Sequence, residues 1–299
     1  MLTSRKKIHL IIGLIVCFAA LLAMNEKANA APSFKVEKIG KGKQHMILIP
    51  GLTCPGEVWS ETVTRYQNKY TLHVISLPGF AGIPAIETNE YLKTMRDELI
   101  VYIKDNKLKK PILVGHSLGG FLSLWISATE PELVGPNFIV DALPFLPAAQ
   151  NPNATVENTK AMAESMYKMM VNATPEQTKQ SQQYFLSTMA TAQDKLDIIS
   201  KWGIDSDAGT VAKAMYEMQT TDLRKEVANI KVPVTVLGAW IGYKNFGVTR
   251  ELSEQMYTNQ YNALTTVNII MSDTAKHFIM YDDPQWFFEQ MDKFLNNNK

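Results

Sequence analysis

The sequence has little cysteine, almost no net charge and no glycine- or proline-rich tract. Two cysteines among 299 residues cannot build a disulfide-rich scaffold. The 30 Lys and Arg residues nearly balance the 29 Asp and Glu residues, and a net charge of +1 lacks the basic excess that a nucleic-acid or membrane-surface partner requires. The 16 glycines and 14 prolines occur singly or in pairs, which excludes fibrous and disordered classes.

Motifs for metals and cofactors are also missing. The sequence contains no metal-ligand spacing, no phosphate-cradling glycine loop and no internal repeat, so neither a metal nor a cofactor is predicted. What the chain does have is apolar material, because 46 % of its residues are hydrophobic. A length of 299 residues then allows one large domain or two small ones.

The first 30 residues have the organisation of a signal peptide. A positive segment, Arg5–Lys7, precedes the almost entirely apolar run Ile8–Met24, and Ala28-Asn29-Ala30 offers a small-x-small cleavage pattern. We expect cleavage after Ala30 and export to a periplasm or to the outside, with no stable membrane association afterwards. An uncleaved membrane anchor is the alternative, although 17 apolar residues are at the short end for a membrane span. Cys54 would be the single cysteine of the mature chain.

Short apolar runs alternate with longer amphipathic ones in the rest of the chain. The short runs are rich in β-branched residues and are typical of buried parallel strands, whereas the longer ones are typical of helices. This alternation predicts an α/β fold with a mostly parallel sheet. Apolar Phe34, Val36 and Ile39 alternate with charged residues over 34–39, which predicts an edge strand. The other expected strands are 46–49, 72–76, 112–114, 138–140, 234–237 and 267–270, and the expected helices include 90–104, 118–129 and 284–295.

One long stretch contains no strand-like run. Residues 147–207 are polar, Ala-rich and Met-rich, and we expect them to form a helical cap inserted into a core domain made of residues 31–146 and 208–299. Seven of the 15 methionines lie between Met162 and Met218. These side chains either line a pocket for apolar ligands or fill the interface between cap and core.

A candidate nucleophile lies in the segment Gly115-His116-Ser117-Leu118-Gly119. This G-x-S-x-G pattern follows an expected strand and precedes an expected helix. Such a turn holds its serine in a strained backbone and presents the hydroxyl at the helix N-terminus, above the carboxyl edge of the sheet. Ser117 is therefore the predicted nucleophile.

A serine needs a base, and the chain has only five histidines. His9 lies in the signal segment, His45 and His73 lie at or within expected strands, and His116 should point away from the neighbouring nucleophile. His277 follows the last expected strand, in a loop that can reach the turn across the carboxyl ends of the strands. Elimination therefore favours His277 as the base.

The third member of a triad is a carboxylate that orients the histidine. Asp141 follows the expected strand 138–140 and should lie at the same sheet edge as the nucleophile, whereas the loop 238–245 contains no acid at all. Asp141 is therefore preferred. The rival acids are Asp205, Asp207, Asp273 and Asp222, of which Asp222 is expected to cap a helix.

A developing oxyanion needs two hydrogen-bond donors. The backbone N–H of Leu118 is one candidate, because it opens the helix after the nucleophile. The N–H of Leu52 is the other, in the loop after strand 46–49, although Pro50-Gly51 also fits an ordinary strand-end turn. Cys54, beside this loop, has no glycine-flanked turn to present it and is interpreted as a packing residue.

These motifs together resemble the α/β-hydrolase superfamily over nearly all of the mature chain. The resemblance implies an eight-stranded, mostly parallel sheet, a helical cap inserted after strand 6, and the chain order Ser, acid, His. The carrying segments are Ile49–Leu52 with Trp59 downstream, Leu77–Gly82, Val114–Gly120, Val140–Ala142, Ile230–Pro233 and Lys276–Phe278.

The sequence departs from the family pattern in two places. The usual acid after the penultimate strand is missing, which resembles the subset whose acid follows the sixth strand, as in haloalkane dehalogenases. Those enzymes use an Asp nucleophile, so Ser117 indicates acyl chemistry instead. Pro50 replaces the histidine of the common His-Gly oxyanion loop, which leaves the backbone donor available.

The expected function is that of an exported serine hydrolase that cleaves a small to medium apolar ester through an acyl-enzyme. Phe145, Leu146 and Trp240 are the expected substrate contacts, and the partner is a small molecule rather than a nucleic acid or a metal. Hydrolysis of C–C bonds, perhydrolysis or acyl transfer by the same triad, or a non-catalytic binding protein with this fold, are the alternatives. The sequence indicates no oligomeric state.

Overall fold

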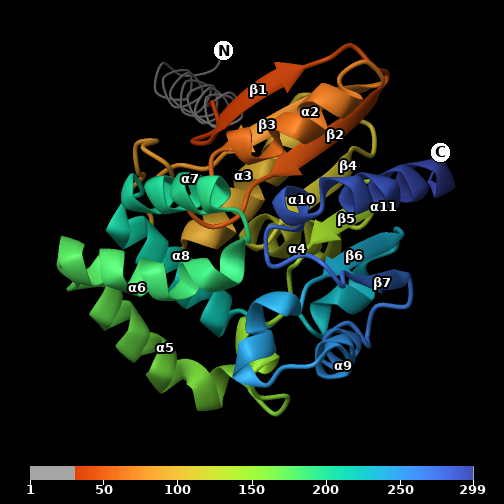
Figure 1. Cartoon of the computed structure of the whole chain (residues 1–299). Coiled ribbons are helices and arrows are strands. Elements are labelled where there is room, and N and C mark those ends of the chain that lie inside the picture. The colour runs from red at the N-terminus through yellow and green to blue at the C-terminus, as the bar shows by residue number, and fades with distance from the viewer. Residues whose placement is uncertain (1–30, 299) are drawn as a thin grey trace, which may run out of the picture. The chain divides into compact units, whose positions relative to one another are not determined.

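Seven strands form one sheet in the computed structural model, which describes residues 31–298 (Figure 1). The strand order is β1-β3-β2-β4-β5-β6-β7, in which β1 pairs with β3 antiparallel and every other pairing is parallel. The predicted signal peptide, residues 1–30, lies outside the described residues. The strands are β1 (Lys35–Ile39), β2 (Gln44–Ile49), β3 (Tyr70–Ser76), β4 (Ile112–His116), β5 (Asn137–Val140), β6 (Val234–Gly238) and β7 (Val267–Met271).

The predicted fold class is confirmed, with one correction to the strand count. Each of the seven runs expected from the sequence forms a strand, and the 34–39 run is the antiparallel edge strand β1. The eighth strand, which came from the family resemblance alone, is absent from residues 31–298 because no further run there has a strand pattern. The predicted cap consequently follows the fifth strand, β5, in chain order.

Helices cover both faces of the sheet because successive side chains of a strand point to opposite faces. In β2, Ile47 packs into one core cluster with α3 (Tyr91–Asp105), α4 (Leu118–Thr129) and α9 (Arg250–Gln260). Leu48 packs into the other cluster, with α2 (Ser60–Tyr66), α10 (Ile279–Asp282) and α11 (Pro284–Asn297). Short 3-10 helices complete the chain: η1 (Gly56–Trp59), η2 (Leu146–Ala149), η3 (Glu226–Asn229) and η4 (Ile241–Phe246).

The stretch expected to form the cap is entirely helical between its connecting turns. Its helices are α5 (Val156–Val171), α6 (Pro175–Met189) and α7 (Gln193–Ile204), followed by α8 (Ala208–Thr220) (Figure 1). Helix α5 packs on α8, with the rings of Tyr167 and Tyr216 5.7 Å apart. The predicted boundaries at 147 and 207 remain a prediction. No helix among residues 31–298 has the length and hydropathy to cross a bilayer.

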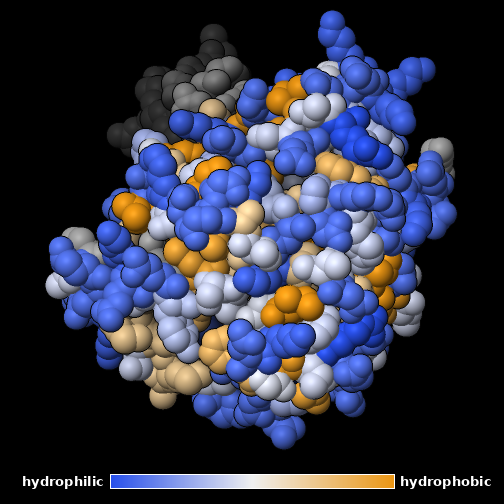
Figure 2. All heavy atoms as spheres, viewed as in Figure 1, coloured by the Kyte–Doolittle hydropathy of each residue, from blue (hydrophilic) through white to orange (hydrophobic). Residues whose placement is uncertain are grey.

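The methionines of the cap region divide into two groups. Met218 is buried and Met215 packs partly buried against the core, as expected of side chains that fill an interface. Met162 and Met169 of α5 are instead 54 % and 66 % exposed. Figure 2 shows a moderately hydrophobic patch over α5, within a face that is otherwise mostly hydrophilic. Filling of the cap–core interface therefore explains only part of the methionine content.

Candidate active site

The predicted nucleophile lies at the carboxyl end of the central strand of the sheet. Ser117 follows β4 directly and has φ 51° and ψ −118°, a conformation that a residue with a side chain rarely adopts. Such strain costs roughly 1–3 kcal/mol and persists where the surrounding structure enforces it. Its N–H donates to the carbonyl of Val140 on β5 at 2.9 Å, and α4 begins at the next residue, Leu118. The sequence motif therefore forms the strained strand-to-helix turn that it predicts.

Glycines bring the loop after β2 close to this turn. A Cβ on Gly119 would lie 2.2 Å from the carbonyl oxygen of Ile49. A Cβ on Gly51 would lie 2.8 Å from His116 Nδ1 and 3.3 Å from Ser117 Cβ. Side chains at these two positions would therefore push the loop and the turn apart, and their absence places the Pro50–Thr53 loop beside the serine.

The predicted base and acid are in direct contact. His277, after β7, and Asp141, after β5, are joined by a hydrogen bond of 2.5 Å between Nδ1 and Oδ2. The side chains are mostly buried, with 19 % and 9 % of their surfaces exposed. This geometry fixes the ring so that Nε2 is the nitrogen free to accept a proton.

The second oxygen of Asp141 is held from two sides. Oδ1 accepts from the backbone N–H of Ala239, after β6, at 2.8 Å and from the hydroxyl of Tyr257, on α9, at 2.5 Å. The backbone of Asp141 is also left-handed, with φ 49°. Sequence reasoning did not find Ala239 or Tyr257, because a backbone donor and a helical tyrosine carry no motif.

The rival acids have other partners. Asp205 pairs with Lys201, and Asp207 caps α8 by accepting from the N–H of Thr210 at 2.7 Å. Asp273 accepts from Arg250 Nε at 2.9 Å and makes no hydrogen bond to His277 among the described residues. Of the five candidate acids, the structure brings Asp141 to the imidazole.

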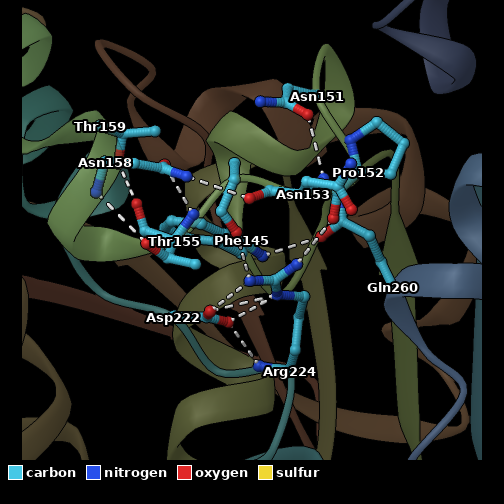
Figure 3. Close-up of polar contacts among 11 residues, drawn as sticks. Phe145, Asn151, Pro152, Asn153, Thr155, Asn158, Thr159, Asp222, Arg224 and Gln260 are labelled. Atoms are coloured by element: carbon cyan, nitrogen blue, oxygen red, sulfur yellow. Dashed lines mark hydrogen bonds and ion pairs between the residues drawn. The ribbon is translucent and has the colours of Figure 1, made fainter.

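Asp222 forms a different structure from the helix cap that the sequence predicts. It accepts from the backbone N–H and the guanidinium of Arg224, two residues later, and η3 begins beyond them (Figure 3). Arg224 in turn donates to the carbonyl of Ala154 at 2.7 Å. This ion pair therefore fastens the start of the cap to the core, and the helix-cap interpretation is wrong.

Within residues 31–298, the hydroxyl of the predicted nucleophile, Ser117, and the imidazole of the predicted base, His277, form no hydrogen bond with each other. The ring of His116, the residue before the nucleophile, lies against the ring of His277 at 4.7 Å, and its Nε2–H donates to the His277 carbonyl at 3.2 Å. Burial, together with the neighbouring His277 charge, holds the pKa of His116 well below its usual range. His116 is thus a neutral side chain that packs against His277 and supports its backbone.

The loop of the base is attached to the predicted cap. The segment 187–191, at the end of α6, runs beside this loop, and the Phe278 N–H donates to the Met189 carbonyl at 2.9 Å. Asp282, on α10, accepts from the Thr191 N–H at 2.7 Å. The position of the base therefore depends on the segment 187–191 as well as on the sheet.

The predicted oxyanion donors come from the first residue of α4 and from the loop after β2. Leu118 is the first residue of α4, whose leading amides have no partner within the helix. Leu52 lies in the loop that Gly51 holds against Ser117, and within residues 31–298 its N–H donates to no backbone carbonyl. Two free amides near one hydroxyl are what oxyanion stabilisation requires.

The expected substrate contacts differ in their accessibility. Leu146 and Trp240 are half-buried, and Trp240 follows the amide that binds Asp141. Phe145 is fully buried in a small cluster with Ala148, below the guanidinium of Arg224 at 4.8 Å (Figure 3). Its ring is therefore not on an accessible surface, which corrects the expectation that it contacts substrate.

The remaining singled-out residues are structural. His73 is buried. Its Nε2 is hydrogen-bonded to His45 Nδ1 at 2.9 Å, and its Nδ1 is hydrogen-bonded to the Tyr102 hydroxyl at 2.7 Å. Cys54 is buried, and burial raises the pKa of its thiol, so it is a packing residue as predicted. Among the described residues, no group of three His, Cys, Asp or Glu side chains is placed to hold a metal ion.

Comparisons with relatives show where this architecture occurs. A pimeloyl-[acyl-carrier protein] methyl ester esterase of Proteus mirabilis is 33 % identical over 115 residues, which are 38 % of this chain and 41 % of that enzyme. The enzyme of the same description from Aeromonas hydrophila is 24 % identical over 272 residues, or 88 % and 99 % of the two chains.

Solved structures show the same fold at lower identity. MenH from S. aureus superposes with a TM-score of 0.73 at 16 % identity, over 89 % of this chain and 98 % of that one. An enol-lactonase from Burkholderia xenovorans gives 0.71 at 14 % identity, over 88 % and 96 %. The model of the alpha/beta hydrolase family matches residues 46–290, which include most of β2, all of β3 to β7 and all the predicted site residues. This chain therefore belongs to the alpha/beta hydrolase family.

Proposed function

We propose that this hydrolase is a serine esterase in which Ser117, His277 and Asp141 act as a catalytic triad. The observation that carries the proposal is the 2.5 Å hydrogen bond between His277 and Asp141, at the sheet edge where Ser117 has a strained backbone. A strained backbone and a buried histidine–carboxylate pair both lower the stability of a fold. Their presence at one site is explained by catalysis, whereas packing alone would not require them.

In this mechanism Ser117 Oγ attacks the ester carbonyl and its proton passes to His277 Nε2. The N–H groups of Leu52 and Leu118 stabilise the oxyanion of the tetrahedral intermediate. The alcohol then leaves with the proton from His277, which gives an acyl-enzyme. Water, deprotonated by the same imidazole, releases the acid and restores the serine, while Asp141 stabilises the imidazolium at each step.

Substrate binding would complete the contact between nucleophile and base. Catalytic hydrogen bonds are often long or misaligned without substrate and tighten in the complex. The ring of His277 lies 4.7 Å from the ring of His116, the residue before Ser117, so the proposed step requires His277 Nε2 to reach the Ser117 hydroxyl when substrate binds.

The proposed substrate is a small to medium apolar ester. Both relatives compared above are named as methyl ester esterases, which supports ester chemistry. Leu146 and Trp240, which are half-buried apolar side chains in the loops after β5 and β6, support an apolar acyl or alcohol group.

A covalent probe tests this proposal. A fluorophosphonate should label the parent protein at Ser117, and Ser117→Ala should remove the label and lower hydrolysis of p-nitrophenyl esters by about 10⁴-fold or more. A series of acyl chains from acetate to decanoate would then give the preferred length. A folded parent protein that takes up no label and hydrolyses none of these esters would contradict the proposal and favour a binding protein.

Export is a separate part of the proposal. The basic, apolar and small-residue segments of residues 1–30 support a cleaved signal peptide. Amino-terminal sequencing of the protein from the exporting host should begin at Ala31. A protein that retains Met1 and sediments with membranes would show the anchor alternative instead.

A further inference from the structure

The last turn of α9 holds the chain segment that joins the proposed acid to the cap. Tyr257, Gln260 and Tyr261 are spaced i, i+3 and i+4, so that they share one face of the helix, and all three are buried. The Tyr261 hydroxyl donates to the Ala142 carbonyl at 2.8 Å. Gln260 accepts from the Phe145 N–H at 3.0 Å, and both residues are labelled in Figure 3. One helix face therefore fixes residues 141–145.

We propose that Tyr257 is a positioning residue for the catalytic carboxylate of Asp141. The inference rests on the proposed function, since it takes Asp141 to be the acid of the triad. Tyr257 is 3 % exposed and its hydroxyl donates to Oδ1 at 2.5 Å, on the oxygen that does not contact His277. With the Ala239 amide on the same oxygen, the carboxylate is turned so that Oδ2 faces the imidazole.

The hydroxyl is a permanent donor in this environment. Burial, and next the negative charge of Asp141, raise the pKa of Tyr257 well above its usual range, so the phenol keeps its proton at every working pH. Because the Tyr257 hydroxyl is buried, water cannot replace Asp141 as its hydrogen-bond acceptor. Tyr257 therefore both orients the carboxylate and stabilises its ionised form.

Loss of this donor has a consequence with a definite sign. A carboxylate that accepts one hydrogen bond fewer is less stable when ionised, so it binds a proton more readily. In a variant without the donor, Asp141 and His277, which share a short hydrogen bond, should therefore bind a proton more readily. The acid limb of the activity profile should then move to higher pH. A tyrosine with a purely structural role would lower stability and leave that limb in place.

The experiment compares Tyr257→Phe with Tyr261→Phe. Each variant removes one buried phenol hydroxyl from the same helix face, but the Tyr261 hydroxyl binds a carbonyl rather than the carboxylate. From pH 5 to 9, kcat for a p-nitrophenyl ester should fall about tenfold at pH 7 in Tyr257→Phe, with KM within about twofold. The midpoint of its acid limb should rise by about one pH unit. Tyr261→Phe should keep the parent's midpoint.

Two further variants keep the outcome decisive. If Tyr257→Phe keeps the kcat and the midpoint of the parent, the positioning role is wrong. Asp141→Asn in the same assay tests the proposed function separately, because full activity in that variant would show that Asp141 is not the acid of the triad. If Tyr257→Phe does not fold, 3-fluorotyrosine at position 257 keeps the hydroxyl and makes it a stronger donor. The midpoint should then move to lower pH, and an unchanged midpoint would overturn the inference.

Discussion

The two sides of the His277 imidazole are held by different parts of the molecule. On one side Nδ1 is bonded to Asp141, whose carboxylate is fixed by the loop after β6 and by α9. On the other side the ring makes no hydrogen bond to Ser117, and the loop that carries it is attached to the segment 187–191 of the predicted cap. Asp141 is therefore held by the core, whereas the path from His277 to Ser117 depends on the segment 187–191 of the predicted cap.

The attachment to the cap consists mostly of bonds to backbone groups. Lys276 Nζ donates to the carbonyls of Ser187 and Ala190 at 2.8 and 3.1 Å. Asp282 accepts from the Lys276 N–H at 2.9 Å as well as from Thr191. A shift of the segment 187–191 would therefore be transmitted to the histidine loop, while Asp141 would stay in place.

Breaking the acid side should have the largest effect. Asp141→Asn leaves the shape of the residue but gives the imidazole no anion, and kcat should fall by about 10⁴-fold. Asp222→Asn is the matched control, because it weakens an ion pair with Arg224 that lies away from the triad. The control should change kcat by less than about threefold. Equal and small losses in both variants, measured by steady-state kinetics, would remove Asp141 from the proposed role.

The pH dependence of stability should come from a region remote from the site. Burial, followed by the charges of His45 and Lys38, lowers the pKa of His73 to about 4 from 6.5. Below pH 6.5 the unfolded chain therefore takes up a proton that the folded chain excludes. The free energy of unfolding should fall by up to about 3 kcal/mol between pH 6.5 and 4.

Urea unfolding of the parent and of His73→Gln would isolate this effect. Between pH 7 and 4 the parent should lose up to about 3 kcal/mol more stability than His73→Gln, which has no imidazole to titrate. Parallel curves would show that another group titrates. The result sharpens the comparison, because it separates the pH dependence of the fold from that of the catalytic pair.

Weakening the cap attachment should have the smallest effect. Asp282→Ala removes the bridge between the histidine loop and Thr191, and kcat should fall about tenfold because the base is less well placed. Asp292→Ala provides the control, since it removes a partly exposed acid that binds Arg65 and Tyr66 instead. Thermal unfolding of both variants would show whether they lose similar amounts of stability, so that a difference in kcat can be assigned to the position of His277. An unchanged kcat in Asp282→Ala would show that the cap does not position the base.

Much of the architecture could be predicted because each strand has a local signature. Runs such as 112–114 and 234–237 are short, β-branched and bounded by turn residues, and the alternation of apolar with charged residues over 34–39 identified the edge strand β1. Asp283-Pro284 marked the start of α11, where Asp283 accepts from the Trp286 N–H at 3.0 Å. Asp141 could be singled out since loop 238–245 offers no competing acid.

The contacts that support the site could not be predicted in the same way. The amide of Ala239 and the carbonyl of Met189 are backbone groups, which have no sequence pattern. Tyr257 lies on an amphipathic helix, where a tyrosine is typical of core packing. Phe145 was expected in the substrate site because it precedes the cap, but the Arg224 guanidinium covers its ring. Such tertiary partners are fixed by the fold as a whole.

A crystal structure of the protein after reaction with a fluorophosphonate would test the triad most directly. The account predicts phosphorus on Ser117 Oγ and a phosphoryl oxygen between the amides of Leu52 and Leu118. His277 Nε2 should lie within about 3.2 Å of the serine oxygen while Nδ1 keeps its bond to Asp141. An adduct on another residue, or an imidazole that stays out of reach of Ser117 in the adduct, would contradict it.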